Sequence, residues 1–185
     1  MQVTVTEAEE QRYAELQRMA LDFARKGETQ WLRDMVDHGL PVDLADEKGN
    51  TLLMLASYNG NAETTQMLLD RWADVDRRNH HGQTPLGGAA FKGYTEIVDL
   101  LLEYGADIDA NNGAGMTPIM FAAMFGRERV VEQLKAHGAS LAQRNRVGVS
   151  AGLMVRISRW TAGALRMGLG HLCRILRVQP GSSEQ

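Results

Sequence analysis

The sequence predicts an all-α fold, a solenoid of about five helix–turn–helix repeats with projecting hairpin-like loops. Residue types recur at a constant step of about 33 residues, apolar residues within each period follow helical spacing, and glycines stand where helices should end. A fixed period of this length is the sequence signature of a solenoid, whose repeats bury their apolar faces against one another. We therefore expect one continuous core through most of the 185 residues.

The period appears in several independent registers. One register consists of Thr51, Thr84, Thr117 and Ser150, and others consist of Gly49, Gly82, Gly115 and Gly148, of Gly27, Gly60, Gly93 and Gly126, of Ala56, Ala89 and Ala122, and of Asp43, Asp76 and Asp109. Agreement among so many registers is not expected by chance.

The N-terminal end should begin with a helix. Residues 1–13 are expected to form an arm and the start of a capping helix. Thr6 and Glu9 have the spacing of a capping box, in which each side chain satisfies the other residue's backbone N–H. We predict a helix over residues 6–19 that hides the apolar face of a degenerate first repeat at 14–45.

Three clear repeats are expected at residues 46–144. Within them, Thr84 followed by Pro85 and Thr117 followed by Pro118 each predict a helix start, since the Thr hydroxyl caps the helix and Pro has no N–H to lose. Gly93 predicts the end of the first of these helices in a left-handed conformation. A second helix should follow before the chain turns outward into a loop. The apolar residues of this second helix are Ile97, Val98, Leu100, Leu101 and Leu102 in one repeat, and Val130, Val131 and Leu134 in the next.

The C-terminal end leaves three alternatives open. Residues 145–178 form either an irregular fifth repeat with a basic C-terminal cap, an amphipathic helix over 153–178, or a tail that does not fold against the repeats. Residues 133–183 carry 8 Lys and Arg and no acid. In a helix, five arginines would share one face: Arg156, Arg159, Arg166, Arg174 and Arg177. Residues 179–185 are expected to be a disordered tail.

The repeat resembles the ankyrin repeat. The resemblance rests on Asn79–Leu86, Glu96–Val98 and Gly105–Ala110, and it extends over about residues 14–151. It identifies the chain as similar to small stand-alone ankyrin-repeat proteins.

Three features depart from the family pattern. The His that usually follows Thr-Pro-Leu is replaced by Met54, Gly87 and Met120, so its bridge to the backbone should be missing. Gly87 and Gly88 place two glycines in one helix, at a cost of about 1 kcal/mol each relative to Ala. Trp72 stands where other repeats have glycine.

The resemblance implies a non-catalytic module that binds a protein partner on its concave face, as an adaptor, inhibitor or assembly factor. The surface positions that vary in the family then predict the partner-binding residues. These are Tyr58, Asn59, Arg78, His80, His81, Gln83, Phe91, Lys92, Asn111, Met116, Met124 and Phe125.

An apolar stripe crosses three repeats within this set. Tyr58, Phe91 and Met124 follow one another at the step of the repeat, and Phe125 widens the far end. Large apolar side chains at exposed positions are typical of interaction hot spots. The alternative is that they pack between adjacent helices as core. Glycines beside Phe91 would leave a hollow for a partner's side chain.

Charge argues against nucleic acid as the partner. Residues 1–132 carry 12 Lys and Arg against 22 Asp and Glu, whereas proteins that bind nucleic acid usually present a basic patch. The basic segment after residue 133 leaves an alternative function open, attachment to an anionic membrane or to an acidic partner. The lone Cys173 and the absence of a signal or spanning segment lead us to expect a cytoplasmic protein, and we expect a monomer.

No residue pattern in the sequence predicts catalysis or metal binding. The adjacent pair His80 and His81 does not converge as i,i+4 histidines would. The aspartates near Asp74 and Asp107 lack the third carboxylate, the glycine and the distant glutamate of a calcium-binding EF-hand loop. Cys173 has only His171 near it, in the uncertain segment. We therefore expect no cofactor and no metal, and an enzyme would need an unrecognised site.

Overall fold

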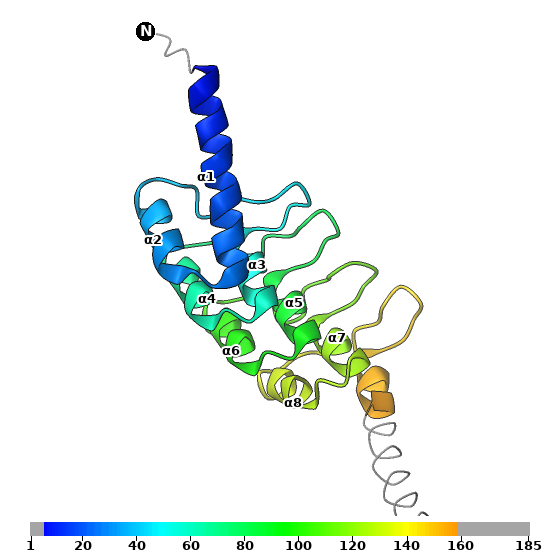
Figure 1. Ribbon diagram of the computed structural model, residues 1–185. Coiled ribbons are helices and arrows are strands. Elements are labelled where there is room, and N and C mark those ends of the chain that lie inside the picture. The colour runs from blue at the N-terminus through cyan, green and yellow to red at the C-terminus, as the bar shows by residue number, and fades with distance from the viewer. Residues whose placement is uncertain (1–5, 159–185) are drawn as a thin grey trace, which may run out of the picture.

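The computed structural model describes residues 6–158, which form a helical solenoid (Figure 1). Its helices are α1 (Glu7–Lys26), α2 (Thr29–Asp37), α3 (Leu52–Asn59), α4 (Ala62–Leu69), α5 (Pro85–Lys92), α6 (Thr95–Glu103), α7 (Pro118–Met124) and α8 (Glu128–Ala136), and a further helical segment covers 151–158. Among the described residues, extended pairing is limited to two isolated bridges, Ala45 with Thr51 and Arg144 with Ser150. The prediction of an all-α solenoid is confirmed.

The helices form two layers. The inner layer consists of α1, α3, α5 and α7, and the outer layer of α2, α4, α6 and α8, with the loops projecting to one side of the inner helices (Figure 1). Each inner helix packs against the next inner helix and against the outer helix that follows it. The core lies between the layers and runs along the whole stack. Its fully buried side chains include Leu32, Leu53, Leu68, Leu86, Ile97, Leu101, Ile119, Val130 and Leu134.

The predicted cap forms at α5 but only in part at α7. The Thr84 hydroxyl accepts a hydrogen bond from Gly87 N at 3.2 Å, and α5 ends at Gly93 with φ of 88°. Thr117 has the extended backbone of an N-cap, but its buried hydroxyl has no hydrogen-bond partner. The prediction that its hydroxyl caps α7 is therefore wrong. Pro118 still starts that helix without losing an N–H.

The N-terminal helix is longer than predicted. The capping box forms, because Thr6 N donates to Glu9 Oε2 at 2.8 Å and Glu9 N donates to the Thr6 hydroxyl at 3.3 Å. However, the helix does not end near residue 19 but continues to Lys26. The capping helix and the first inner helix are thus one element, α1. Its second half packs on α3, and its first half rises beyond the loops (Figure 1).

Aspartates at one repeat position tie successive repeats together. The Asp43 carboxylate accepts a hydrogen bond from Asp74 N at 3.0 Å, and the Asp76 carboxylate accepts one from Asp107 N at 2.9 Å. Asp109 accepts one from the next repeat in the same way. Burial raises the pKa of Asp76, against the opposing effect of its hydrogen bond from Asp107. These carboxylates therefore have a structural explanation in the repeat.

The start of a fifth repeat is present before the described region ends. Val149 N donates to Asn145 Oδ1 at 3.0 Å, as residues of earlier loops do. Ala151 and Val155 are buried on the helical segment 151–158. The three alternatives for the chain beyond residue 158, and the predicted tail at 179–185, lie outside the described residues.

Replacing Trp72 with glycine is expected to stabilise the fold by about 0.5–1 kcal/mol. Trp72 has φ of 63°, where an L side chain is strained, and it is 91% exposed, so few contacts are lost. Relief of a left-handed conformation gains about 1–2 kcal/mol, offset in part by the greater freedom of glycine in the unfolded chain. Thermal unfolding measures the change, and a lower melting temperature would contradict the prediction.

The equivalent position in a later repeat provides the control. Gly105 has φ of 85°, and a Cβ there would meet no atom within 4 Å. Gly105→Ala should therefore destabilise the fold through backbone strain alone, opposite in sign to Trp72→Gly.

Candidate functional site

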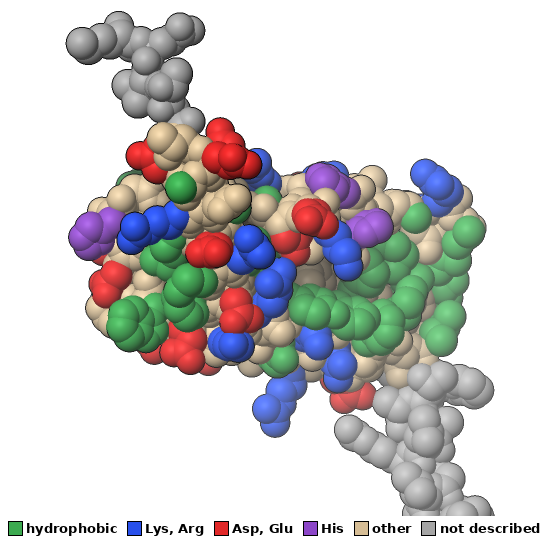
Figure 2. Space-filling model, turned by 45° about the horizontal axis from the view of Figure 1, so that its top comes forward, with side chains coloured by type: hydrophobic (Ala, Val, Ile, Leu, Met, Phe, Trp, Pro, Cys, Tyr) green, Lys and Arg blue, Asp and Glu red, His purple; other side chains and the backbone are tan. Residues whose placement is uncertain are grey.

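A groove runs along the concave side, between the loops and the inner helices. Its volume is about 1110 Å³. The space-filling view shows the hollow near the middle of this face, beside a band of apolar side chains (Figure 2). The first loop is the segment 38–51 between α2 and α3, the second is 70–84 between α4 and α5, and the third is 104–117 between α6 and α7. Residues from α1, the first loop, α3 and α5 line the groove, and a few come from the later loops and from α7. The groove is therefore a candidate for a binding site.

Three aromatic rings form a continuous ladder, and two of them, Tyr58 and Phe91, line the groove. The rings of Tyr58 and Phe91 are stacked with centroids 6.2 Å apart, and Phe91 meets Phe125 edge to face at 4.3 Å. The Lys92 ammonium lies 4.5 Å from the centroid of the Tyr58 ring. Aromatic rings arranged in this way attract one another and attract a nearby cation.

The ladder is neither pure core nor isolated surface. Tyr58 is 43% exposed and Phe125 is 44% exposed, while Phe91 between them is half-buried. Met124 is 53% exposed. The side chains thus pack between adjacent inner helices and still present apolar area to solvent. The two alternatives for the stripe each describe part of it.

The second loop is held in place by one buried asparagine. Asn79 Oδ1 accepts hydrogen bonds from His81 N and Gln83 N, both at 3.0 Å, and Asn79 Nδ2 donates to Asn50 Oδ1 at 2.9 Å. The tip of the same loop is tied to the previous one, since His80 N donates to Lys48 O at 3.0 Å. The loop residues near the groove are therefore positioned before any partner arrives.

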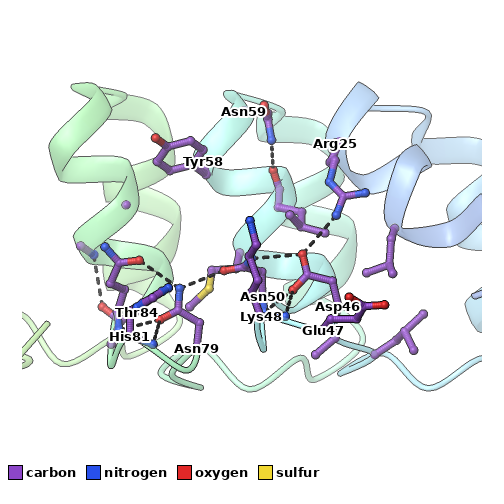
Figure 3. A pocket seen from close by; sticks show the side chains of 18 of the residues that line it. Arg25, Asp46, Glu47, Lys48, Asn50, Tyr58, Asn59, Asn79, His81 and Thr84 are labelled. Atoms are coloured by element: carbon purple, nitrogen blue, oxygen red, sulfur yellow. Dashed lines mark hydrogen bonds and ion pairs between the residues drawn. The ribbon is translucent and has the colours of Figure 1, made fainter. Parts of the chain in front are cut away.

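The first loop carries an anion that is already neutralised. Asp46 accepts hydrogen bonds from Lys48 N and Asn50 N, and its carboxylate forms an ion pair with Arg25 of α1 at 3.1 Å (Figure 3). Burial raises the pKa of Asp46, but the hydrogen bonds from Asn50 and Lys48 and the charge of Arg25 outweigh it, so the pKa lies below its usual value. Asp46 stays ionised and paired near neutral pH.

The space over Gly87, the first of the two adjacent glycines, is filled. Asn112, 4% exposed, lies over Gly87, and a Cβ on Gly87 would lie 2.0 Å from Asn112 Oδ1. Asn112 Oδ1 accepts hydrogen bonds from Thr84 N at 2.7 Å and from the Thr84 hydroxyl at 3.0 Å, and its Nδ2 donates to Ala110 O at 2.9 Å. Asn112 therefore fills the space over Gly87, whereas Gly88 and Phe91 line the groove. The histidine bridge is missing in this repeat, and Asn112 supplies another one between Thr84 and Ala110.

A shift in the third loop allows Asn112 to turn inward. Asn111, one residue earlier, accepts hydrogen bonds from Gly113 N and Gly115 N at 3.0 Å, the role that Asn79 has in the second loop. The loop then passes through three consecutive residues with positive φ, of which Ala114 is not a glycine. Because Asn111 closes the loop, the side chain of the neighbouring Asn112 is available for other hydrogen bonds.

One predicted binding residue is in the core. Met116 is only 9% exposed and packs in the main hydrophobic cluster, whereas Asn50 and Gln83 at the same repeat position are polar and more exposed. An apolar thioether at this position is more stable buried than in water. Met116 therefore presents little surface that a partner could contact.

The remaining predicted residues lie at the surface or partly buried. Asn59, Arg78, His80, His81, Gln83, Asn111, Met124 and Phe125 are exposed, and Lys92 is half-buried. Tyr58, Asn59, His81, Gln83 and Phe91 line the groove itself. Figure 3 places Tyr58 and Asn59 above the loop residues that close the groove from below.

Sequence reasoning missed the wall formed by α1. Ala14, Gln17, Arg18, Leu21 and Arg25 line the groove from this helix. Their helical spacing places them on one face, so the signal was present in the sequence. It was overlooked because the helix was expected to end near residue 19.

The described residues contain neither a cluster of metal ligands nor a membrane-spanning helix. No group of three or more His, Cys, Asp or Glu among residues 6–158 is placed to hold a metal ion. No described helix is long and apolar enough to span a membrane. What the groove presents is aromatic area, amides and charged side chains, which suit recognition of another molecule.

The comparisons with known proteins agree with the repeat pattern. A family profile of ankyrin repeats, in three copies, matches residues 20–112 and 71–145. A Pseudomonas aeruginosa protein named as a putative ankyrin repeat protein is 48% identical over 46 residues, which are 25% of this chain and 27% of that protein. The chain thus covers about a quarter of the length of this relative.

Proposed function

Since the chain belongs to the ankyrin-repeat family, we propose that it binds a protein partner in the groove on its concave face. Ankyrin repeats are generally protein–protein interaction modules. The observation that carries the proposal is the aromatic ladder of Tyr58, Phe91 and Phe125, which stays partly exposed and whose Tyr58 and Phe91 line the groove. The module would act as a non-catalytic adaptor, inhibitor or assembly factor.

The ladder fits the chemistry of a binding hot spot. Aromatic side chains are enriched at such sites because they offer large apolar area with little conformational entropy to lose. The rings here are also held by one another, and the loops opposite them are fixed by buried hydrogen bonds. A surface that is ordered before binding loses less entropy when a partner docks.

Replacing Tyr58 and Phe91 together with alanine should abolish capture of the partner while leaving the chain helical. The double change removes the stacked pair but leaves the main core and the helix caps intact. Loss of two aromatic hot-spot side chains costs about 2–4 kcal/mol each in binding, which is more than a hundredfold in affinity. Affinity capture from an extract of the native cells, followed by mass spectrometry, measures it.

Trp31→Ala is the matched control, because Trp31 is an exposed aromatic residue on the outer helix α2. A partner retained by the wild type and by Trp31→Ala, and lost by the folded double variant, supports the proposal. A partner retained equally by all three proteins would place binding elsewhere. Unfolding of the double variant would show that the ladder is core.

A further inference from the structure

The charge of the groove differs from that of the molecule around it. Residues 6–158 carry 16 Lys and Arg against 22 Asp and Glu, a net charge of −6. The groove nevertheless is lined by three cations, Arg18, Arg25 and Lys48, and by two anions, Asp46 and Glu47. Figure 2 shows Lys, Arg and His side chains around the hollow, with Asp and Glu side chains among them. The groove lining therefore carries a net charge of +1, although the chain as a whole is acidic.

The net charge of the groove lining stays at +1 when the paired groups are set aside, because Arg18 and Lys48 then stand against Glu47. Arg25 and Asp46 neutralise each other. Neither Arg18 nor Lys48 forms an ion pair with another residue of the described part of the chain, and neither does Lys92, which faces the Tyr58 ring. Glu47 is the remaining acid of the lining. The groove thus has cations without carboxylate partners beside its aromatic wall.

Many of the acids are engaged on the outer layer. Asp37 forms an ion pair with Arg71 at 2.7 Å, which holds the pKa of Asp37 below its usual value. Asp70 accepts hydrogen bonds from Tyr104 and Gln66, and Asp99 accepts one from Gln133. These carboxylates link neighbouring outer helices, on the opposite side from the groove.

We propose that the groove takes an extended acidic segment of a partner protein, with carboxylates toward Arg18 and Lys48 and an apolar side chain against the aromatic ladder. This inference rests on the proposed function and adds the chemistry of the partner. Inner helices pack about 8–10 Å apart, so the four of them span roughly 27 Å. About eight extended residues cover that distance at roughly 3.3–3.6 Å per residue.

A protein segment fits better than a nucleic acid. The surrounding net charge of −6 repels a polyanion that extends past the groove. A short stretch of Asp and Glu meets the few unpaired cations, and its apolar neighbours match the rings. Complementary charge of this kind fixes the direction in which the segment lies.

Selection from a display library of random peptides, each about 12 residues long so as to exceed the span of the groove, tests the proposal with the full chain as bait. Peptides that bind the wild type and not Tyr58→Ala/Phe91→Ala are retained and sequenced. We expect them to be enriched in Asp and Glu over Lys and Arg, with one aromatic or aliphatic position. A groove-dependent set that is neutral or basic would overturn the acidic segment and leave the proposed function standing. Absence of any groove-dependent peptide would count against both.

Charge reversal then identifies the contacts. The double change Arg18→Glu/Lys48→Glu should weaken a selected acidic peptide about tenfold, and a copy of the peptide with Lys in place of Asp and Glu should recover the loss. Arg129→Glu, an exposed change on the outer helix α8, is the control and should leave affinity unchanged. Equal affinity of the wild type and of the charge-reversed variant for the selected peptide overturns the proposal. A competition experiment gives a second test: the proposal is also overturned if single-stranded oligothymidylate displaces the bound peptide more strongly than the unlabelled peptide does.

Discussion

Replacing Gly87 with alanine is expected to lower the free energy of unfolding by about 2–3 kcal/mol, although alanine is the better helix former. The new Cβ would lie 2.0 Å from Asn112 Oδ1, so the asparagine must leave its site. Two hydrogen bonds from Thr84 and one to Ala110 O are then lost in a buried place. A buried polar group without a partner costs about 1–3 kcal/mol, more than the gain in helix propensity.

The neighbouring glycine supplies the control in the same helix. A Cβ on Gly88 would approach Tyr58 Cδ2 at 3.3 Å, and this half-exposed ring can move by a few tenths of an ångström. Gly88→Ala should therefore be neutral or stabilise by up to about 1 kcal/mol. Denaturant unfolding of both variants measures the difference. Equal effects would show that Gly87 has no special role.

Asn112→Ala is expected to destabilise the fold by about 2 kcal/mol for the same physical reason. It removes the acceptor of Thr84 N and of the Thr84 hydroxyl, and it opens a void over Gly87. Asn111→Ala is the matched control, since Asn111 is exposed and closes the third loop through two hydrogen bonds. Its loss should cost about 1 kcal/mol, because water can satisfy the freed N–H groups.

The two positions should be strongly coupled. In a chain that already carries Gly87→Ala, the further change Asn112→Ala removes the clashing amide and should cost little or restore stability. A double-mutant cycle measures this coupling, expected at about 1–3 kcal/mol for groups in contact. Additive effects of the two changes would contradict the lock between Gly87 and Asn112.

Much of the fold could be predicted from the sequence, because in a solenoid each position of the period has the same physical task. Once in each period a Thr precedes a helix and a glycine ends it, and the structure has a helix between the two, as in α3 and α5. The site was harder to predict. The exposed ladder was inferred from the spacing of Tyr58, Phe91 and Met124, but only the structure shows that Phe125 rather than Met124 completes the ring contacts.

The missed features depend on departures from the period. Asn112 and Met116 lie in a loop whose asparagine turn begins one residue early, so their environments differ from those of Asn79 and Gln83. A repeat pattern predicts the environment that a position has in most repeats, and it does not predict a shift of one residue in a single loop. The groove wall of α1 was missed for a related reason, since the first repeat is too degenerate for the period to mark where its helix ends.

Hydrogen–deuterium exchange of the chain, with and without its captured partner, tests the central claim most directly. Amide exchange reports which backbone segments become protected when a partner covers them. We predict slower exchange at the C-terminal ends of α3, α5 and α7 and in the loops around Lys48 and His81, which border the groove. Protection confined to the outer helices α2, α4, α6 and α8 would contradict a binding site on the concave face.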